Sequence, residues 1–196
     1  MTSGLPSPGP RLILASLSPR RRELLARLPY LFEVRSLPVR EFSDGELPAE
    51  ELPLRNAEAK ARAVAEMFPD AVVIGADTVI IFDGRIIGKP RDAQDAFRTL
   101  SQLSGRTHEV VTGVALLRRR DGLCKTWSAC TRVTFKKLSP DAIREYMRIV
   151  DVLDKAGSYA LQEHGDMIVS RVDGDADNVV GLPLGRLAAE LARLEM

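Results

Sequence analysis

The chain contains an unbroken apolar run at residues 71–74, which small and polar residues follow at once. A continuous run rich in β-branched side chains is typical of a strand buried on both faces of a sheet. Gly75 interrupts the run, and the carboxylate of Asp77 comes two residues later. We therefore expect Asp77 at the end of a buried strand, where a rigidly held carboxylate can act as a metal ligand or a general base.

Two further segments flank an Asp-Gly dipeptide, the apolar run 80–82 and residues 85–87, in which Arg85 precedes two isoleucines. Asp-Gly between apolar runs favours a tight two-residue hairpin turn. Such a hairpin would carry Lys89, in a Gly-Lys-Pro sequence, back toward Asp77. Lys89 would then place a positive charge close to the group on which Asp77 acts.

The remaining apolar positions predict strands and helices that alternate irregularly, which indicates an α/β domain with a mixed sheet rather than a regular doubly wound one. We expect further strands at residues 11–15, 32–34, 110–117, 126–135 and 167–172. We expect helices that begin near residues 19, 51, 93, 140 and 184.

Residues 1–10 consist mostly of Gly, Pro and Ser, a composition typical of a disordered tail. The sequence shows no internal repeat and no linker after residue 10, so we expect residues 11–196 to form a single domain. The polar, Gly-containing stretch 153–162 is more typical of a binding loop than of a connector. Residues 174–178 are predicted to form a turn.

Three consecutive arginines, Arg20 to Arg22, follow Ser18 and Pro19 at the predicted start of the first helix. Ser is a good N-cap and Pro suits the first helical position, whereas cations are mildly unfavourable beside the positive end of the helix dipole. One interpretation is a polyphosphate cradle made of guanidinium groups, serine hydroxyls and backbone N–H groups. The alternative is a solvated basic turn.

The balance of charges and the histidine count limit the classes of partner. Lys plus Arg total 28 against 27 for Asp plus Glu, which argues against a general nucleic-acid binder. With only two histidines, His108 and His164, a zinc site would lack ligands, so any metal is expected to be a hard cation bound through oxygen.

Cysteine usage and hydropathy indicate the compartment. Cys124 and Cys130 would point to one face of a strand, too far apart to bond to each other, and we expect buried reduced thiols. No apolar run approaches membrane-spanning length, and the N-terminus lacks a signal pattern. We therefore expect a cytoplasmic protein with no membrane partner and no stable nucleic-acid partner.

Each of these candidates also has a structural alternative. An Asp at a strand end is often a turn former, and a Gly-Lys-Pro sequence is often a solvated bend. Lys60 lies beside the apolar stripe of the helix predicted near residue 51, where a surface lysine commonly lies over the core.

Five segments of the chain carry recognisable motifs: LASLSPRRREL (14–24), GADTVI with GKP (75–90), LSGRTHEVVTGV (103–114), LDKAGSYALQ (153–162) and NVVGLPL (178–184). In their order and spacing they resemble the Maf family of nucleoside triphosphate pyrophosphatases, from Arg11 to the C-terminus. The resemblance implies an α/β fold with an elongated mixed sheet and two lobes around a cleft, similar to inosine triphosphate pyrophosphatases. It also implies a homodimer and cleavage between the α and β phosphates with a divalent cation, Mg²⁺ or Mn²⁺.

The resemblance also assigns roles to residues of this chain. Asp77 matches the position of the family's catalytic aspartate. The resemblance also implies that Asp77 and Glu41 are the metal ligands. This chain has Pro-Val-Arg-Glu at residues 38–41, where the family usually has a sequence like Asp-Val-Asp-Glu. The positions assigned to substrate binding are Ser16, Arg20, Arg21, Lys60, Thr78, Lys89 and Gln162.

The branch of the family is indicated by Thr78, by His108 and by the Asp-Lys-Ala-Gly sequence at 154–157, which resemble the branch acting on dTTP and UTP. The implied activity is hydrolysis of dTTP and UTP, or of modified pyrimidine triphosphates, to the monophosphate and pyrophosphate. An alternative is a non-catalytic nucleotide-sensing regulator linked to cell division arrest.

Overall fold

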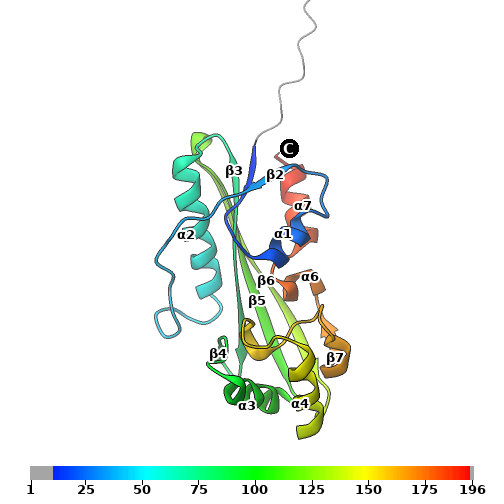
Figure 1. Ribbon diagram of the computed structural model, residues 1–196. Coiled ribbons are helices and arrows are strands. Elements are labelled where there is room, and N and C mark those ends of the chain that lie inside the picture. Colours follow the sequence, from blue (N-terminus) through cyan, green and yellow to red (C-terminus); the bar gives the residue numbers. More distant parts are fainter. Residues whose placement is uncertain (1–10, 195–196) are drawn as a thin grey trace, which may run out of the picture.

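The computed structural model describes residues 11–194, so the tail expected at residues 1–10 lies outside the described residues. The described chain forms a seven-stranded mixed sheet in the order β2-β1-β3-β5-β6-β7, with β4 paired to β3 (Figure 1). Two pairings, β1 with β2 and β1 with β3, are parallel, and the others are antiparallel. The strands are β1 (Leu12–Leu14), β2 (Phe32–Val34), β3 (Val72–Phe82), β4 (Arg85–Ile87), β5 (Thr107–Arg118), β6 (Leu123–Phe135) and β7 (Val169–Asp173).

Helices cover both faces of the sheet, and the expectation of an α/β fold with a mixed sheet is confirmed. Their starts follow the sequence signals, because Ser18, Asp92 and Ser139 each cap a helix with the side chain. The helices are α1 (Pro19–Leu25), α2 (Leu52–Met67), α3 (Ala93–Leu103), α4 (Pro140–Ile149), α5 (Gly165–Ile168), α6 (Ala176–Val180) and α7 (Leu184–Ala192), with short 3₁₀ turns η1 (Arg119–Asp121) and η2 (Ala156–Ser158).

The two faces of the long strands carry different helices because side chains alternate along a strand. On one face, Val73 of β3 and Ala115 of β5 pack against α2. On the other face, Ile74 and Leu116 belong to a core with α1 and α7 at one end of the strands. A second core, with α3 and α4, covers the same face at the other end (Figure 1). The two cores make two lobes.

One edge of β3 is open between these lobes. Strand β5 pairs with one edge of β3 along Val73–Ile81, so β1 and β4 share the other edge. Strand β1 pairs only as far as Ile74, and β4 pairs only from Ile80. Within the described residues, the intervening stretch of β3 therefore has no strand partner on that edge.

Three sequence expectations are corrected. Asp77 does not lie at a strand end, because β3 runs on through Gly75 to Phe82 as one strand paired with β5. Residues 176–180 form the short helix α6 where a turn was expected, since Asp175 caps the backbone N–H of Asp177. Cys124 and Cys130 are free, as expected, but exposed rather than buried, because their face of β6 meets solvent.

The hairpin prediction is confirmed, since β3 and β4 are joined by Asp83 and Gly84. Both residues have positive φ, 50° and 74°, as the tightest hairpin turns require. Among residues 11–194, no helix is long and apolar enough to cross a membrane.

Candidate active site

A pocket opens at the unpaired edge of β3 and is lined from both lobes. Because the edge is open, side chains from the two faces of the sheet reach the same space. Seven of the nine residues proposed from the sequence line the pocket, and the other two, Ser16 and Lys60, contact residues that line it. The seven are Arg20, Arg21, Glu41, Asp77, Thr78, Lys89 and Gln162.

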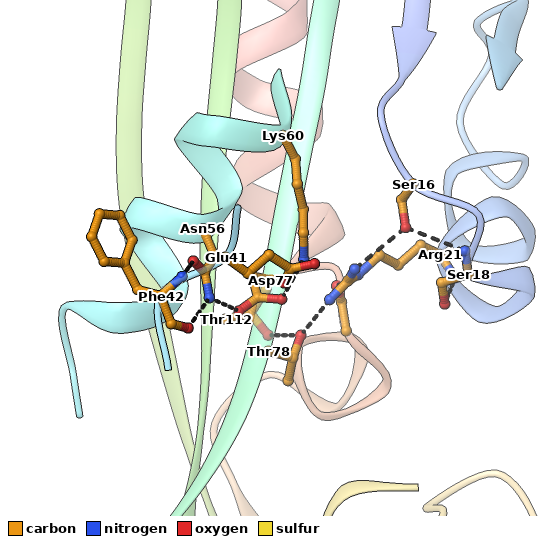
Figure 2. Close-up of polar contacts among 11 residues, drawn as sticks. Ser16, Ser18, Arg21, Glu41, Phe42, Asn56, Lys60, Asp77, Thr78 and Thr112 are labelled. Carbon is orange, nitrogen blue, oxygen red and sulfur yellow. Dashed lines mark hydrogen bonds and ion pairs between the residues drawn. The ribbon is translucent and has the colours of Figure 1, made fainter. Parts of the chain in front are cut away.

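Asp77 and Thr78, which are adjacent in β3, point to opposite faces of the sheet (Figure 2). The Asp77 side chain turns toward α2, where Lys60 Nζ lies 2.7 Å from Asp77 Oδ1. The same ammonium lies 2.6 Å from Oε2 of Glu41, in the loop before α2. Lys60 therefore bridges the two carboxylates that the sequence assigned to a metal, rather than standing free for phosphate.

Asn56 is a member of this cluster that the sequence reasoning missed. Its Nδ2 donates to Asp77 Oδ2 at 3.2 Å and to the Phe42 carbonyl at 3.1 Å, while its Oδ1 accepts from the Phe42 N–H at 2.7 Å (Figure 2). The amide thus joins the loop that carries Glu41 to the carboxylate of Asp77. A signal was present, because Asn56 lies four residues before Lys60 and so shares its helix face.

Arg21 occupies the other side of the open edge. Its guanidinium donates to the Gly181 carbonyl at 3.0 Å, to Ser16 Oγ at 3.3 Å and to Thr78 Oγ1 at 3.0 Å. All three acceptors are uncharged. Burial lowers the pKa of Arg21, and the opposite charges of Asp77 and Glu41 partly offset this effect. An arginine keeps its proton in proteins, so the pocket contains a cation whose hydrogen-bond partners do not neutralise it.

The Thr78 hydroxyl belongs to a chain of hydrogen bonds whose direction the chemistry fixes. Thr112 Oγ1 donates its one proton to the Asn178 carbonyl at 3.1 Å. At the 2.9 Å contact between the two threonines, Thr78 must therefore donate to Thr112. Thr78 also accepts from Arg21, so its remaining capacity is that of an acceptor.

The second lobe brings Lys89, Gln162 and the loop around Asp154 to the pocket. The Gly157 N–H donates to the Gly88 carbonyl at 3.1 Å, which ties this loop to the Gly-Lys-Pro sequence. Asp154 Oδ2 lies 3.8 Å from a guanidinium nitrogen of Arg20 in α1, so this ion pair connects the two sides of the pocket. Burial raises the pKa of Asp154, but the hydrogen bond from Lys155 and the charges of Lys155, Arg20 and Lys89 together lower it.

His108 stands behind the pocket wall rather than in it. Its Nε2 lies 2.8 Å from the hydroxyl oxygen of Tyr159, which lines the pocket. Burial lowers the pKa of His108 to about 4 and raises the pKa of Tyr159. His108 is thus a neutral support for Tyr159 at neutral pH.

Comparisons with known proteins show which family this chain resembles along its whole described length. A family model described as "Maf-like protein" matches residues 11–194. A relative from Akkermansia muciniphila, named dTTP/UTP pyrophosphatase, is 51% identical over 175 residues, covering 89% of this chain and 92% of the relative. A relative of the same name from Moorella thermoacetica is 46% identical over 182 residues, covering 93% and 94% of the two chains.

Among solved structures, the Staphylococcus aureus Ham1 protein has a similar fold. The TM-score is 0.51 at 14% identity, with 93% of this chain and 98% of that chain covered. This likeness concerns the fold and supports the arrangement of the sheet and its lobes.

Proposed function

The chain belongs to the Maf family, and from that premise we propose that it is a hydrolase that cleaves dTTP and UTP to the monophosphate and pyrophosphate. The proposal is supported by the names of relatives that are 43–51% identical to this chain over most of its length. Modified pyrimidine triphosphates remain within the proposed substrate class, because one methyl group in a pocket changes binding by only about 1 to 3 kcal/mol.

The observation that carries the proposal is that Arg21 has only neutral hydrogen-bond acceptors. A half-buried guanidinium whose three hydrogen-bond acceptors are neutral is costly unless an anion completes its environment. Arg20 and Lys89 line the same pocket and add two positive charges. A triphosphate carries several negative charges, which these three cations would neutralise.

The carboxylate side of the pocket suits a hard divalent cation such as Mg²⁺ or Mn²⁺. Among residues 11–194, no group of three or more His, Cys, Asp or Glu side chains could hold a metal. Mg²⁺, however, is commonly bound through one or two carboxylates together with substrate phosphates. Glu41 and Asp77 would be those carboxylates, and the cation would supply neutralisation of phosphate charge.

Each residue of the pocket would then have a separate role in hydrolysis. Each oxygen of Asp77 already accepts one hydrogen bond, from Lys60 or from Asn56, and keeps capacity to accept another from a water molecule. Asp77 would take a proton from that water molecule while the water oxygen attacks the α phosphorus. The bond from the α phosphorus to the bridging oxygen breaks, and pyrophosphate leaves with the electron pair. Arg20, Arg21 and Lys89 would hold the phosphate oxygens, and Gln162 would contact the nucleotide at the rim.

A screen of pyrophosphate release tests the proposed function. Purified protein is incubated with canonical and modified triphosphates in Mg²⁺ or Mn²⁺, and the products are separated by chromatography. We expect monophosphate and pyrophosphate, with dTTP and UTP among the best canonical substrates. Release of orthophosphate would contradict the cleavage position, and no turnover with any nucleotide would favour a nucleotide-sensing regulator.

Asp77→Asn isolates the proposed base. The amide keeps the shape of the side chain but cannot accept the proton, so turnover should fall by about 10²- to 10⁴-fold while nucleotide binding stays measurable. Steady-state kinetics and calorimetric binding provide the two readouts. Asp70→Asn, at a 76% exposed side chain remote from the pocket, serves as the matched control and should keep normal turnover. Near-normal turnover of Asp77→Asn would remove Asp77 from this role.

We further propose that the protein is a homodimer in the cytoplasm. The family resemblance supports the dimer, and the cytoplasmic supply of nucleoside triphosphates supports the location. Light scattering of the purified protein should give twice the 21.6 kDa mass of one chain.

A further inference from the structure

One ammonium group joins the two carboxylates of the site. Lys60 Nζ lies 2.6 Å from Glu41 Oε2 and 2.7 Å from Asp77 Oδ1. The Lys60 and Asp77 side chains are only 18% and 15% exposed, so these charges are screened less than those of a surface pair. The contact with Glu41 joins α2 to the loop before it, and the contact with Asp77 joins α2 to β3.

The oxygens that hold Lys60 are the oxygens that a cation would need. The second oxygen of Asp77 is held by Asn56, which leaves Oδ1 as the oxygen directed at Glu41 and Lys60 (Figure 2). A Mg²⁺ ion between Glu41 and Asp77 would need to lie about 2.0 to 2.1 Å from these oxygens. An ammonium already lies between them, and two cations cannot share that space without strong repulsion.

The lysine side chain is suited to move between partners. Its four-carbon stem is flexible and its charge is compact, so the ammonium can change position while the helix stays in place. Arg21 differs in this respect, because its planar group is fixed by three separate acceptors. The neighbouring pocket, where the proposed phosphate oxygens would lie, offers Lys60 an alternative anionic partner.

We propose that Lys60 and a divalent cation compete for the Glu41–Asp77 pair, and that Lys60 moves onto substrate phosphate when the cation binds. This inference rests on the proposed function for the phosphate partner. The exchange keeps the carboxylates neutralised in both arrangements. It also makes the cation bind weakly without nucleotide, because the cation must displace Lys60 from the two carboxylates.

Direct Mn²⁺ binding without nucleotide tests the competition. Free Mn²⁺ is titrated by electron paramagnetic resonance against the wild-type protein, Lys60→Met and Lys89→Met. We expect Lys60→Met to bind Mn²⁺ about tenfold more tightly or better, since the competing ammonium is gone. Lys89→Met removes a positive charge from the neighbouring pocket without removing an ion pair to Glu41 or Asp77, so the Mn²⁺ affinity of this variant should change much less.

Equal gains for both variants would mean that the pocket's overall charge, and not competition by Lys60, controls the metal. An unchanged or weaker affinity in Lys60→Met would also overturn the proposal. Lys60→Arg keeps the positive charge and should not gain affinity. Because no nucleotide is present, these results do not depend on whether the protein hydrolyses triphosphates.

A second measurement uses the wild-type protein and does not depend on the folding of a variant. Lysines are acetylated with an amine-reactive reagent, with and without saturating Mn²⁺, and each site is quantified by mass spectrometry. We expect Mn²⁺ to increase the labelling of Lys60 several-fold relative to Lys125, whose ion pair with Glu190 lies away from the pocket. Lys60 labelling that does not rise with Mn²⁺ would show that the lysine and the cation do not exchange.

Discussion

Asn56 uses a single amide group to hold two segments that are far apart in the sequence. The amide pairs with both backbone groups of Phe42 and donates to Asp77, and Asn56 as a whole residue is 2% exposed. Glu41 precedes Phe42 directly, so the amide sets the position of one carboxylate and contacts the other. Asn56 is therefore a positioning residue, since its contacts are with Asp77 and the loop.

Asn56→Leu should lower kcat by about 10- to 100-fold with a smaller change in KM, as expected when a residue that orients ligands is lost. It should also lower the free energy of unfolding by about 1 to 3 kcal/mol, because the Phe42 groups lose their partner. Steady-state kinetics and denaturant titration give both values. Glu66→Gln, on an exposed part of the same helix, is the control and should change neither. A change in stability alone would make Asn56 a purely structural residue.

At the residue scale, local motifs predicted which side chains would lie together, while their roles stay predictions. Arg20, Arg21, Asp77 and Lys89 stand in short motifs and are brought to one pocket. The partners of Lys60 were not foreseeable, because Glu41 and Asp77 lie 19 and 17 residues away in opposite directions along the chain. Spacing in sequence carries no information about an ion pair that only tertiary packing creates.

Helix α2 carries both Lys60 and Asn56, and two glycines allow it to approach the sheet closely. A Cβ on Gly75 of β3 would lie 2.1 Å from the Ala57 carbonyl oxygen. A Cβ on Gly113 of β5 would lie 2.4 Å from the backbone of Leu54. Gly113 is the register partner of Asp77, so the close approach occurs directly at the site.

Gly113→Ala should push α2 away from the sheet, because backbone atoms cannot give way as a flexible side chain can. We expect a loss of about 3 kcal/mol in the free energy of unfolding, together with lower turnover, since α2 positions Lys60 and Asn56. Denaturant titration and kinetics measure the two effects. In Gly185→Ala, on α7, the new Cβ meets nothing within 4 Å, so stability should be unchanged or slightly higher. Equal behaviour of the two variants would contradict this account of Gly113.

The same glycines explain the main error at the scale of elements. A glycine in an apolar run can mark the end of a strand or a close approach of another backbone, and the sequence does not distinguish the two. The prediction chose the strand end at Gly75, whereas the structure shows a close approach of α2. Helix starts were predicted better, because caps such as Asp92 act through neighbours only three residues away.

On one face of the sheet, two cores lie at opposite ends of the long strands β3, β5 and β6, with the pocket between them, and α2 packs on the other face. Periodicity predicted the mixed sheet and its covering helices, because each helix shows its apolar stripe locally. The cleft came only from the family resemblance, since its position depends on where β1 stops and β4 begins along β3. Such long-range pairing leaves no local pattern.

His108 links the stability of the whole molecule to pH. Its pKa is lowered by burial from 6.5 to about 4, so the folded state stays neutral while the unfolded state gains a proton below pH 6.5. The contribution of neutral His108 to the free energy of unfolding is therefore fully present above pH 6.5 and is lost as the pH falls toward 4. At pH 5 the free energy of unfolding should therefore be about 2 kcal/mol lower than at pH 7.5 from this effect alone.

Denaturant titrations of the wild type and His108→Gln at the two pH values test this prediction. The stability of the wild type relative to His108→Gln should fall by about 2 kcal/mol between pH 7.5 and pH 5. The exposed His164 provides the control, because His164→Gln should follow the wild type at both pH values. A pH-independent difference between the wild type and His108→Gln would show that His108 does not titrate as described.

The open edge of β3 limits what mutation can change at the site. Main-chain groups alternate in direction along a strand, and the Val72 N–H and the Ile74 carbonyl both bond toward β1. The N–H and C=O groups of Ala76 and Thr78 therefore face the gap where β1 has ended. A substitution at these positions changes the side chain but leaves the main-chain N–H and C=O groups in place. A sheet edge thus gives the site fixed polar contacts, around which substitutions can alter ligand preference without removing the site.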